Sequence, residues 1–169
     1  MPPLTVLGRV AIPDHVKAYV PAVMRSWPRE RREVWEVHPP GKSRTTAACL
    51  GHFLETPAVS FLEETLQSFG LLEWDGRGHS MVVFGDVGLH PDEETTCNGK
   101  AGSIFHLVLE GTGTFHLPTV RDKSLRSLQL EPGLAFVFNP NAQHAVSDAC
   151  PGNLATLSAL VPRNFARNR

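Results

Sequence analysis

The sequence predicts a mainly β domain of sandwich, barrel or jelly-roll type, with its helices confined to the first half. The second half carries a series of short apolar runs separated by turn signals, which is typical of these folds. The 14 glycines and 14 prolines are scattered along the chain, so they mark turns between many short elements. Hydrophobic residues make up 41% and charged residues 20% of the 169 residues, and we therefore expect one ordinary globular domain over 1–169.

Two helices are expected to pack on the outside of the β structure. The first begins with Asp14 as its cap and runs to about Ser26, although Pro21 interrupts it. The second begins with Thr56 as its cap, and Gly70 suits its C-terminal cap. The apolar residues of the second helix recur at helical spacing and predict one buried stripe: Val59, Leu62, Leu66 and Phe69.

Short strands are expected between and after these helices. Residues 29–44 are interpreted as a short strand followed by a loop. From Ser80 onward, Gly111-Thr112-Gly113 is interpreted as a tight turn that pairs the two strands on either side of it. Glu131-Pro132-Gly133 is interpreted as a second turn. The strands expected in this half are 81–84, 104–110, 114–117, 128–130, 134–138, 145–146 and 154–161.

Charge and cysteine content give no support for several classes of function. The formal net charge of −1 gives no electrostatic attraction to nucleic acid or to an acidic membrane surface. Cys49, Cys97 and Cys150 are widely spaced and form no CxxC pair, so neither a disulfide framework nor a cysteine zinc site is expected. No apolar stretch is long enough to span a bilayer. We therefore expect a cytoplasmic protein.

Three residues have the character of a metal site. His90 and Asp92 flank Pro91, and residues two apart in an extended chain point to the same side. His144 follows a later aromatic-rich strand and a Pro-containing loop. Two imidazoles and one carboxylate on one face of a metal leave the opposite face open, which is the arrangement of non-haem Fe(II) oxygenases. The alternative interpretation of His90-Pro91-Asp92 is a loop with an Asx turn.

The run from Gly85 to Pro162 resembles the double-stranded β-helix core of the Fe(II)/2-oxoglutarate-dependent dioxygenases. The matching pieces are GDVGLHPDEE, FHLVLEGTGTFHLP, LEPGLAFVFNPNAQHAV and LATLSALVP. The resemblance implies Fe(II) ligands at His90, Asp92 and His144. It also implies decarboxylation of 2-oxoglutarate to succinate, coupled to hydroxylation or another oxidation of a substrate. On this basis we divide the chain into a helix-rich buttress over 1–79, a β-helix core over 80–162 and a basic tail over 163–169.

One position departs from the family pattern. The resemblance implies an arginine, in an R-x-S motif on the last core strand, for the distal carboxylate of 2-oxoglutarate. Thr156 stands at the arginine position here, and Ser158 stands at the serine position. A threonine lacks the charged, two-donor fork that suits a carboxylate. The cations considered in its place are Arg163, which is slightly favoured, Lys100 and Lys123.

The cupins, which share the barrel, are the alternative resemblance. VLEGTGTFHL followed by a Pro-Gly turn and a histidine is common in cupins, where Glu93 or Glu94 would supply a glutamate ligand. That alternative implies a metal-binding or small-ligand-binding protein, or a related barrel without oxygenase activity. His106 and His116 flank Gly111 and are expected to face one another across the hairpin, with His106 the better residue to line the site. The substrate, a small molecule or a protein, and a homodimeric state are left open.

Overall fold

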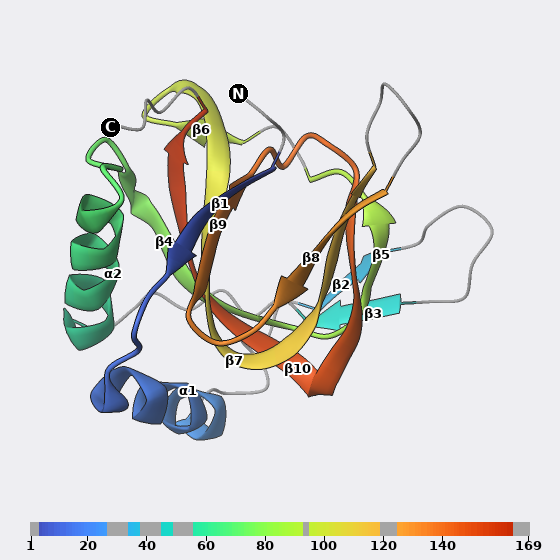
Figure 1. The fold of residues 1–169 in the computed structure, drawn as a ribbon, viewed down its shortest axis with the longest axis horizontal. Helices are drawn as coiled ribbons and strands as arrows, with labels where there is room; N and C mark the ends of the chain where they lie inside the picture. Colours follow the sequence, from blue (N-terminus) through green and yellow to red (C-terminus); the bar gives the residue numbers. More distant parts are fainter. Residues whose placement is uncertain are drawn as a thin grey trace.

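The computed structural model describes residues 4–26, 34–37, 45–48, 56–92, 95–118 and 125–163. These residues form two helices and a curved antiparallel sheet, with a separate two-stranded sheet beside it (Figure 1). The elements are β1 (Leu4–Arg9), α1 (Asp14–Ser26), β2 (Val34–Val37), β3 (Thr45–Ala48), α2 (Thr56–Ser68), β4 (Asp75–Phe84), β5 (Val87–His90), β6 (Thr96–Cys97), β7 (Lys100–Pro118), β8 (Leu125–Leu130), β9 (Leu134–Phe138) and β10 (His144–Pro162).

The main sheet curls into two walls because β7 and β10 each bend and take part in both. The first wall has the order β1-β9-β7-β10-β4. The second wall is built on the other halves of the long strands, where β5 pairs with β10 and β8 pairs with β7. This arrangement is a double-stranded β-helix, which confirms the predicted fold class. The small sheet of β2 and β3 lies beside β5 (Figure 1).

The prediction of a tight turn at Gly111 is wrong. β7 runs without reversal from Lys100 to Pro118, and its two ends pair with different strands. Gly111 has a φ of 85°, which a residue without a Cβ adopts freely, so the strand bends from one wall into the other there. The two final strands predicted from sequence are likewise one strand, β10, that bends near Asp148 with a φ of 57°.

Both predicted helices form with the expected starts, and α2 also ends as predicted. Gly70 has a φ of 74°, and its N–H donates to the carbonyl of Gln67 at 2.9 Å. The N–H of Leu71 donates to the carbonyl of Leu66, also at 2.9 Å. These two hydrogen bonds make a Schellman motif that satisfies the last carbonyls of the helix. β1, which the sequence analysis did not predict, extends the first wall by pairing with β9.

Alternation along the strands separates two apolar clusters. Phe105, Leu107 and Leu109 point outward and pack with the buried Leu62 and Leu66 of α2. Inside the barrel a second cluster is rich in aromatic side chains, and it contains Phe115, Phe136, Phe138, Leu117 and Leu130. The helices therefore cover the outer face of the first wall, and the interior is left to the side chains between the walls (Figure 1).

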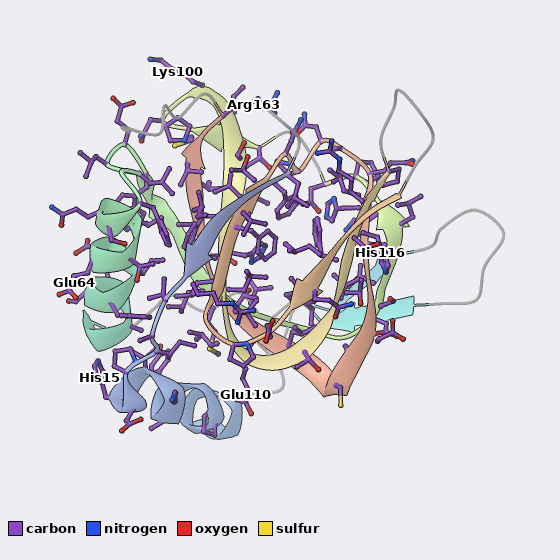
Figure 2. All side chains as sticks on the ribbon, in the orientation of Figure 1. His15, Glu64, Lys100, Glu110, His116 and Arg163 are labelled. Atoms are coloured by element: carbon purple, nitrogen blue, oxygen red, sulfur yellow. The ribbon has the colours of Figure 1, made fainter. Side chains whose placement is uncertain are left out.

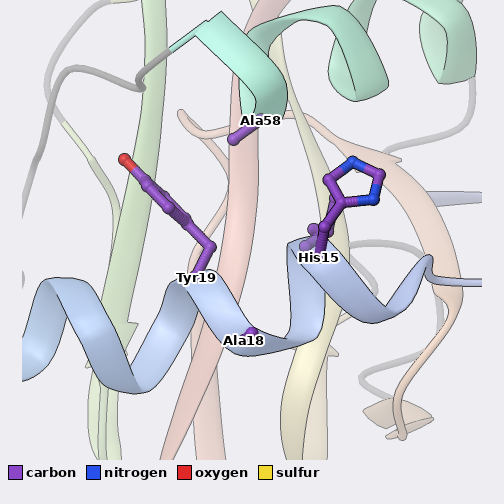
Figure 3. A pocket seen from close by; sticks show the side chains of 5 residues that line it. His15, Ala18, Tyr19 and Ala58 are labelled. Carbon is purple, nitrogen blue, oxygen red and sulfur yellow. The ribbon is translucent and has the colours of Figure 1, made fainter.

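The helical side carries a pocket of about 300 Å³ between α1 and α2 (Figure 3). Its lining is His15, Val16, Ala18, Tyr19 and Ala58. None of these residues belongs to the barrel interior. Neither described helix is long and apolar enough to cross a membrane.

Candidate metal centre

His90, Asp92 and His144 are brought together by the pairing of β5 with β10. His90 is the last residue of β5, His144 is the first residue of β10, and the two are register partners. Asp92 lies two residues after the end of β5, and its N–H donates to the carbonyl of Pro140 at 2.9 Å, which holds it beside the start of β10. One ligand atom from each of the three side chains lies within 4.8 Å of the other two. The convergence expected from sequence is present.

Each imidazole is held by a backbone carbonyl. Nδ1 of His90 lies 2.7 Å from the carbonyl oxygen of Gly88, and Nδ1 of His144 lies 2.9 Å from that of Ala142. A carbonyl oxygen only accepts, so Nδ1 carries the proton in both rings and Nε2 of the neutral ring keeps its lone pair. These Nε2 atoms face Asp92, at 3.5 Å from Oδ1 for His90 and 3.6 Å from Oδ2 for His144. Two nitrogen donors and one carboxylate are thus aimed at one point.

The surroundings of the two histidines differ. The side chain of His144 is 8% exposed, stacked on Phe115 at 5.7 Å and met at its edge by Phe138 at 4.8 Å. Burial lowers the pKa of His144, whereas the hydrogen bond with Asp92 raises the pKa of His90. The side chains of His90 and Asp92 are 21% and 34% exposed, so the group is open to solvent on their side. The sequence analysis missed Phe115 and Phe138, although their alternation places them inside the barrel.

A second polar group lies deeper on the first wall. Nδ1 of His106 lies 2.9 Å from Oγ1 of Thr156 and 2.8 Å from Oγ of Ser158. The ring packs against both Phe136 and Phe138, with each centroid at 5.5 Å. Burial lowers the pKa of His106 to about 4, so the ring is neutral near pH 7. Among the described residues nothing bonds to its Nε2 atom. The sequence analysis treated His106, Thr156 and Ser158 separately, whereas in the structure they form one hydrogen-bonded cluster.

Of the cations expected near Thr156, the two that the structure describes, Arg163 and Lys100, do not lie there. Pro162 is the register partner of Gly102, and the Arg163 N–H continues that ladder by donating to the carbonyl of Ala101 at 3.1 Å. Arg163 follows Thr156 by seven positions, and an odd offset along a strand reverses the face, so Arg163 lies on the outward face of the strand. Its Nε donates to the carbonyl of Gly102 at 3.4 Å. The expectation that Pro162 turns Arg163 inward is therefore not supported.

Lys100 is the first residue of β7, exposed at the same end of the sheet as Arg163 (Figure 2). It precedes His106 by six positions, a distance of about 20 Å along an extended strand. Lys123, Glu93 and Glu94 lie outside the described residues.

His116 is on the outside of the second wall and does not face His106. Its Nδ1 lies 3.1 Å from Oγ of Ser127, and its Nε2 lies 2.8 Å from Oγ of Ser147. The expected contact between the two histidines is wrong because β7 does not reverse at Gly111. His116 accordingly has no part in the group around Asp92.

Several solved structures have a fold similar to that of this chain. A structure described as an oxidoreductase of the 2OG-Fe(II) oxygenase family, from Burkholderia pseudomallei, is similar over 99% of this chain and 88% of its own, with a TM-score of 0.59 at 15% identity. The chain has the fold of these oxygenases. The carbocyclase SnoK from nogalamycin biosynthesis, described as non-heme and alpha ketoglutarate dependent, is similar over 94% of this chain and 79% of its own, with a TM-score of 0.62 at 11% identity.

A prolyl-4-hydroxylase from Pseudomonas putida is also similar, over 96% of this chain and 94% of its own, with a TM-score of 0.54 at 12% identity. No family model matches the sequence, and no curated protein matches it either. At these identities the structural likeness establishes the fold, and the activity has to be argued from the site.

Proposed function

We propose that this chain is a non-haem Fe(II) oxygenase that uses 2-oxoglutarate as cosubstrate. The observation that carries the proposal is the donor set of His90, Asp92 and His144, in which both Nε2 atoms and the carboxylate meet at one point. The backbone carbonyls bound to each Nδ1 fix the tautomer and the ring orientation, as partners of metal-bound histidines do. Two histidines and one carboxylate are the ligand set of non-haem Fe(II) oxygenases.

In this proposal the three side chains would hold Fe(II) on one face only. Bound Fe(II) supplies the redox chemistry by which dioxygen converts 2-oxoglutarate to succinate and carbon dioxide, with one oxygen atom entering succinate and the other entering the substrate. Phe115 and Phe138 exclude water from the His144 side. The exposed side of His90 and Asp92 is where a substrate would enter. Whether that substrate is a small molecule or a protein is left open.

The cluster of His106, Thr156 and Ser158 fits the distal end of 2-oxoglutarate through hydrogen bonds rather than charge. It lies on the inner side of the first wall, close enough that Asp92 and His144 both affect the pKa of His106. The hydroxyl and imidazole hydrogens that are not used within the cluster can donate to a carboxylate. A buried carboxylate needs such partners, because burial without them is strongly disfavoured.

Anaerobic titration tests the proposal. We expect the Fe(II)-loaded chain to develop the visible charge-transfer band of a chelated 2-oxo acid on addition of 2-oxoglutarate, and to release succinate when air is admitted. Asp92→Ala is expected to lose both signals, whereas His116→Ala, on the outer wall, keeps them. Absence of the band and of succinate in wild type that retains iron would overturn the use of 2-oxoglutarate.

A second candidate is a cupin-type metal-binding or small-ligand-binding protein, and the neutral residue at Thr156 favours it. Iron retained by His90, Asp92 and His144 without succinate release would support this candidate. In either case we propose a cytoplasmic setting, which the absence of a CxxC pair supports.

A further inference from the structure

One row of residues crosses the second wall at the level of the candidate metal centre. His90 pairs with His144. Since Ala145 pairs with His116, His144 lies level with Leu117 on the neighbouring strand β7. Leu117 in turn pairs with Arg126 on β8. The register therefore places Arg126 in the same row as both histidines, at the far edge of the wall.

Arg126 lies on the inner face of this wall. Register partners share a face, and Leu117 is fully buried in the interior cluster with Phe115. The next residue of each strand points the other way, because His116 and Ser127 meet outside, at 3.1 Å. Alternation along β8 puts the apolar Leu128 and Leu130 on the same inner face as Arg126.

The distance from Arg126 to the metal centre is short. Neighbouring strands lie about 4.8 Å apart, so the Cα atoms of Arg126 and His144 are separated by about 10 Å across two strand spacings. Arg126 is exposed, whereas Leu130, further along the same strand, is buried. The arginine thus stands at the rim of the barrel, at the level of the row that contains His90 and His144.

The guanidinium of Arg126 has no acidic partner within the described part of the chain. Arg9, by contrast, is paired with Glu131 on the surface. A guanidinium presents donors in a planar fork that matches a carboxylate or a phosphate. At the rim of a barrel whose inner wall supplies only neutral donors near Thr156, such a group is suited to bind an anion.

We infer that Arg126 binds a negatively charged group of a ligand that lies at the candidate metal centre. The location of that ligand rests on the proposed function. The anionic group belongs to the substrate, because the distal end of the 2-oxo acid is assigned to the neutral donors of His106, Thr156 and Ser158 on the other wall. Arg126 is a binding residue and takes no part in holding the metal.

Binding measurements on the full chain test this inference in wild type, Arg126→Gln and the control Arg163→Gln, which removes an outward-facing arginine. Inorganic phosphate is titrated into the metal-free chain by calorimetry. 2-Oxoglutarate and 2-oxobutanoate, which lacks the second carboxylate, are titrated into the Fe(II)-loaded chain without oxygen. We expect Arg126→Gln to weaken phosphate binding at least about tenfold, the size of effect that follows from losing a hydrogen bond to a charged group, and Arg163→Gln to leave it unchanged.

The 2-oxo acids distinguish the two sources of the anion. A tenfold or larger loss for 2-oxoglutarate in Arg126→Gln, with 2-oxobutanoate unchanged, overturns the inference, because Arg126 then binds the cosubstrate. Loss of phosphate binding with unchanged 2-oxoglutarate affinity assigns it to an anionic substrate. Equal phosphate and 2-oxoglutarate affinity in wild type and Arg126→Gln overturns the inference. Wild type that binds phosphate through Arg126 but retains no iron overturns the proposed function and leaves the inference standing.

Discussion

The imidazoles of His90 and His144 lie side by side, with ring centroids 4.5 Å apart, because the two residues are register partners on β5 and β10. Neither ring can move away without breaking the hydrogen bond that its Nδ1 makes with a backbone carbonyl. The proposed metal site is therefore built into the strand pairing and exists before any metal binds.

Removing one of these rings is expected to remove the metal. His144→Ala should lower Fe(II) affinity more than about tenfold, because it deletes one of three proposed ligands. The loss of a group that only supports a ligand already lowers metal affinity about 10- to 100-fold. His116→Ala, on the outer wall, should retain wild-type iron. The iron content of wild type and of each variant, determined after dialysis against Fe(II), measures the difference in affinity. Equal iron in both variants and in wild type would count against the site.

Protonation of His106 is expected to destabilise the fold. Its pKa falls from the ordinary 6.5 to about 4 because of burial, so between these values the unfolded chain binds a proton that the folded chain does not. The free energy of unfolding therefore rises as the pH increases from 4 to 6.5 and is level above that, by at most roughly 3 kcal/mol from this group.

Urea unfolding of the metal-free chain across this pH range measures the effect. His106→Gln should lose most of the slope, and His116→Gln should keep it. A wild-type slope that survives in His106→Gln would show that other groups cause it.

The hydroxyl of Thr156 should matter both for stability and for cosubstrate binding. Thr156→Val keeps the shape of the side chain and removes its contact with His106, which should cost about 0.5–1.5 kcal/mol of stability. We also expect 2-oxoglutarate to bind about threefold to tenfold more weakly.

Thr114→Val is the matched control, because Thr114 accepts a hydrogen bond from Gln129 at 3.0 Å in the second wall. It should lose similar stability without a change in 2-oxoglutarate affinity. Calorimetric titration of both variants decides the matter, and equal affinity in the two would remove Thr156 from the cosubstrate site.

Two glycines with positive φ should respond differently to alanine. Gly133 has a φ of 89°, and a Cβ there would lie 2.7 Å from the carbonyl oxygen of Val10. Gly70 has a φ of 74° but no atom within 4 Å of a new Cβ. Gly70→Ala should therefore cost about 1–2 kcal/mol from backbone strain alone. Gly133→Ala should cost clearly more, because the turn must also separate from Val10. Denaturant unfolding compares them, and a smaller loss for Gly133→Ala would contradict the close approach.

Local signals in the sequence determined the helices and two of the three residues of the candidate metal site. Residues near each helix end signal where it begins or ends, and the C-terminal motif at Gly70 is made within a few residues, so the sequence alone is enough to predict these helices. The spacing of His90 and Asp92 is also local, because two residues of extended chain bring their side chains to one side.

Tertiary structure decided what depends on pairing between distant strands. The residues around Gly111 predict a turn when taken alone, yet β7 continues through Gly111. The reason is that one half of β7 pairs with β9 in the first wall and the other half pairs with β8 in the second wall. The same non-local register places His144 beside His90 and Arg126 in their row, and it turns Arg163 outward. A shift of one residue in any strand reverses which side chains face the interior, and only the complete set of pairings fixes that register.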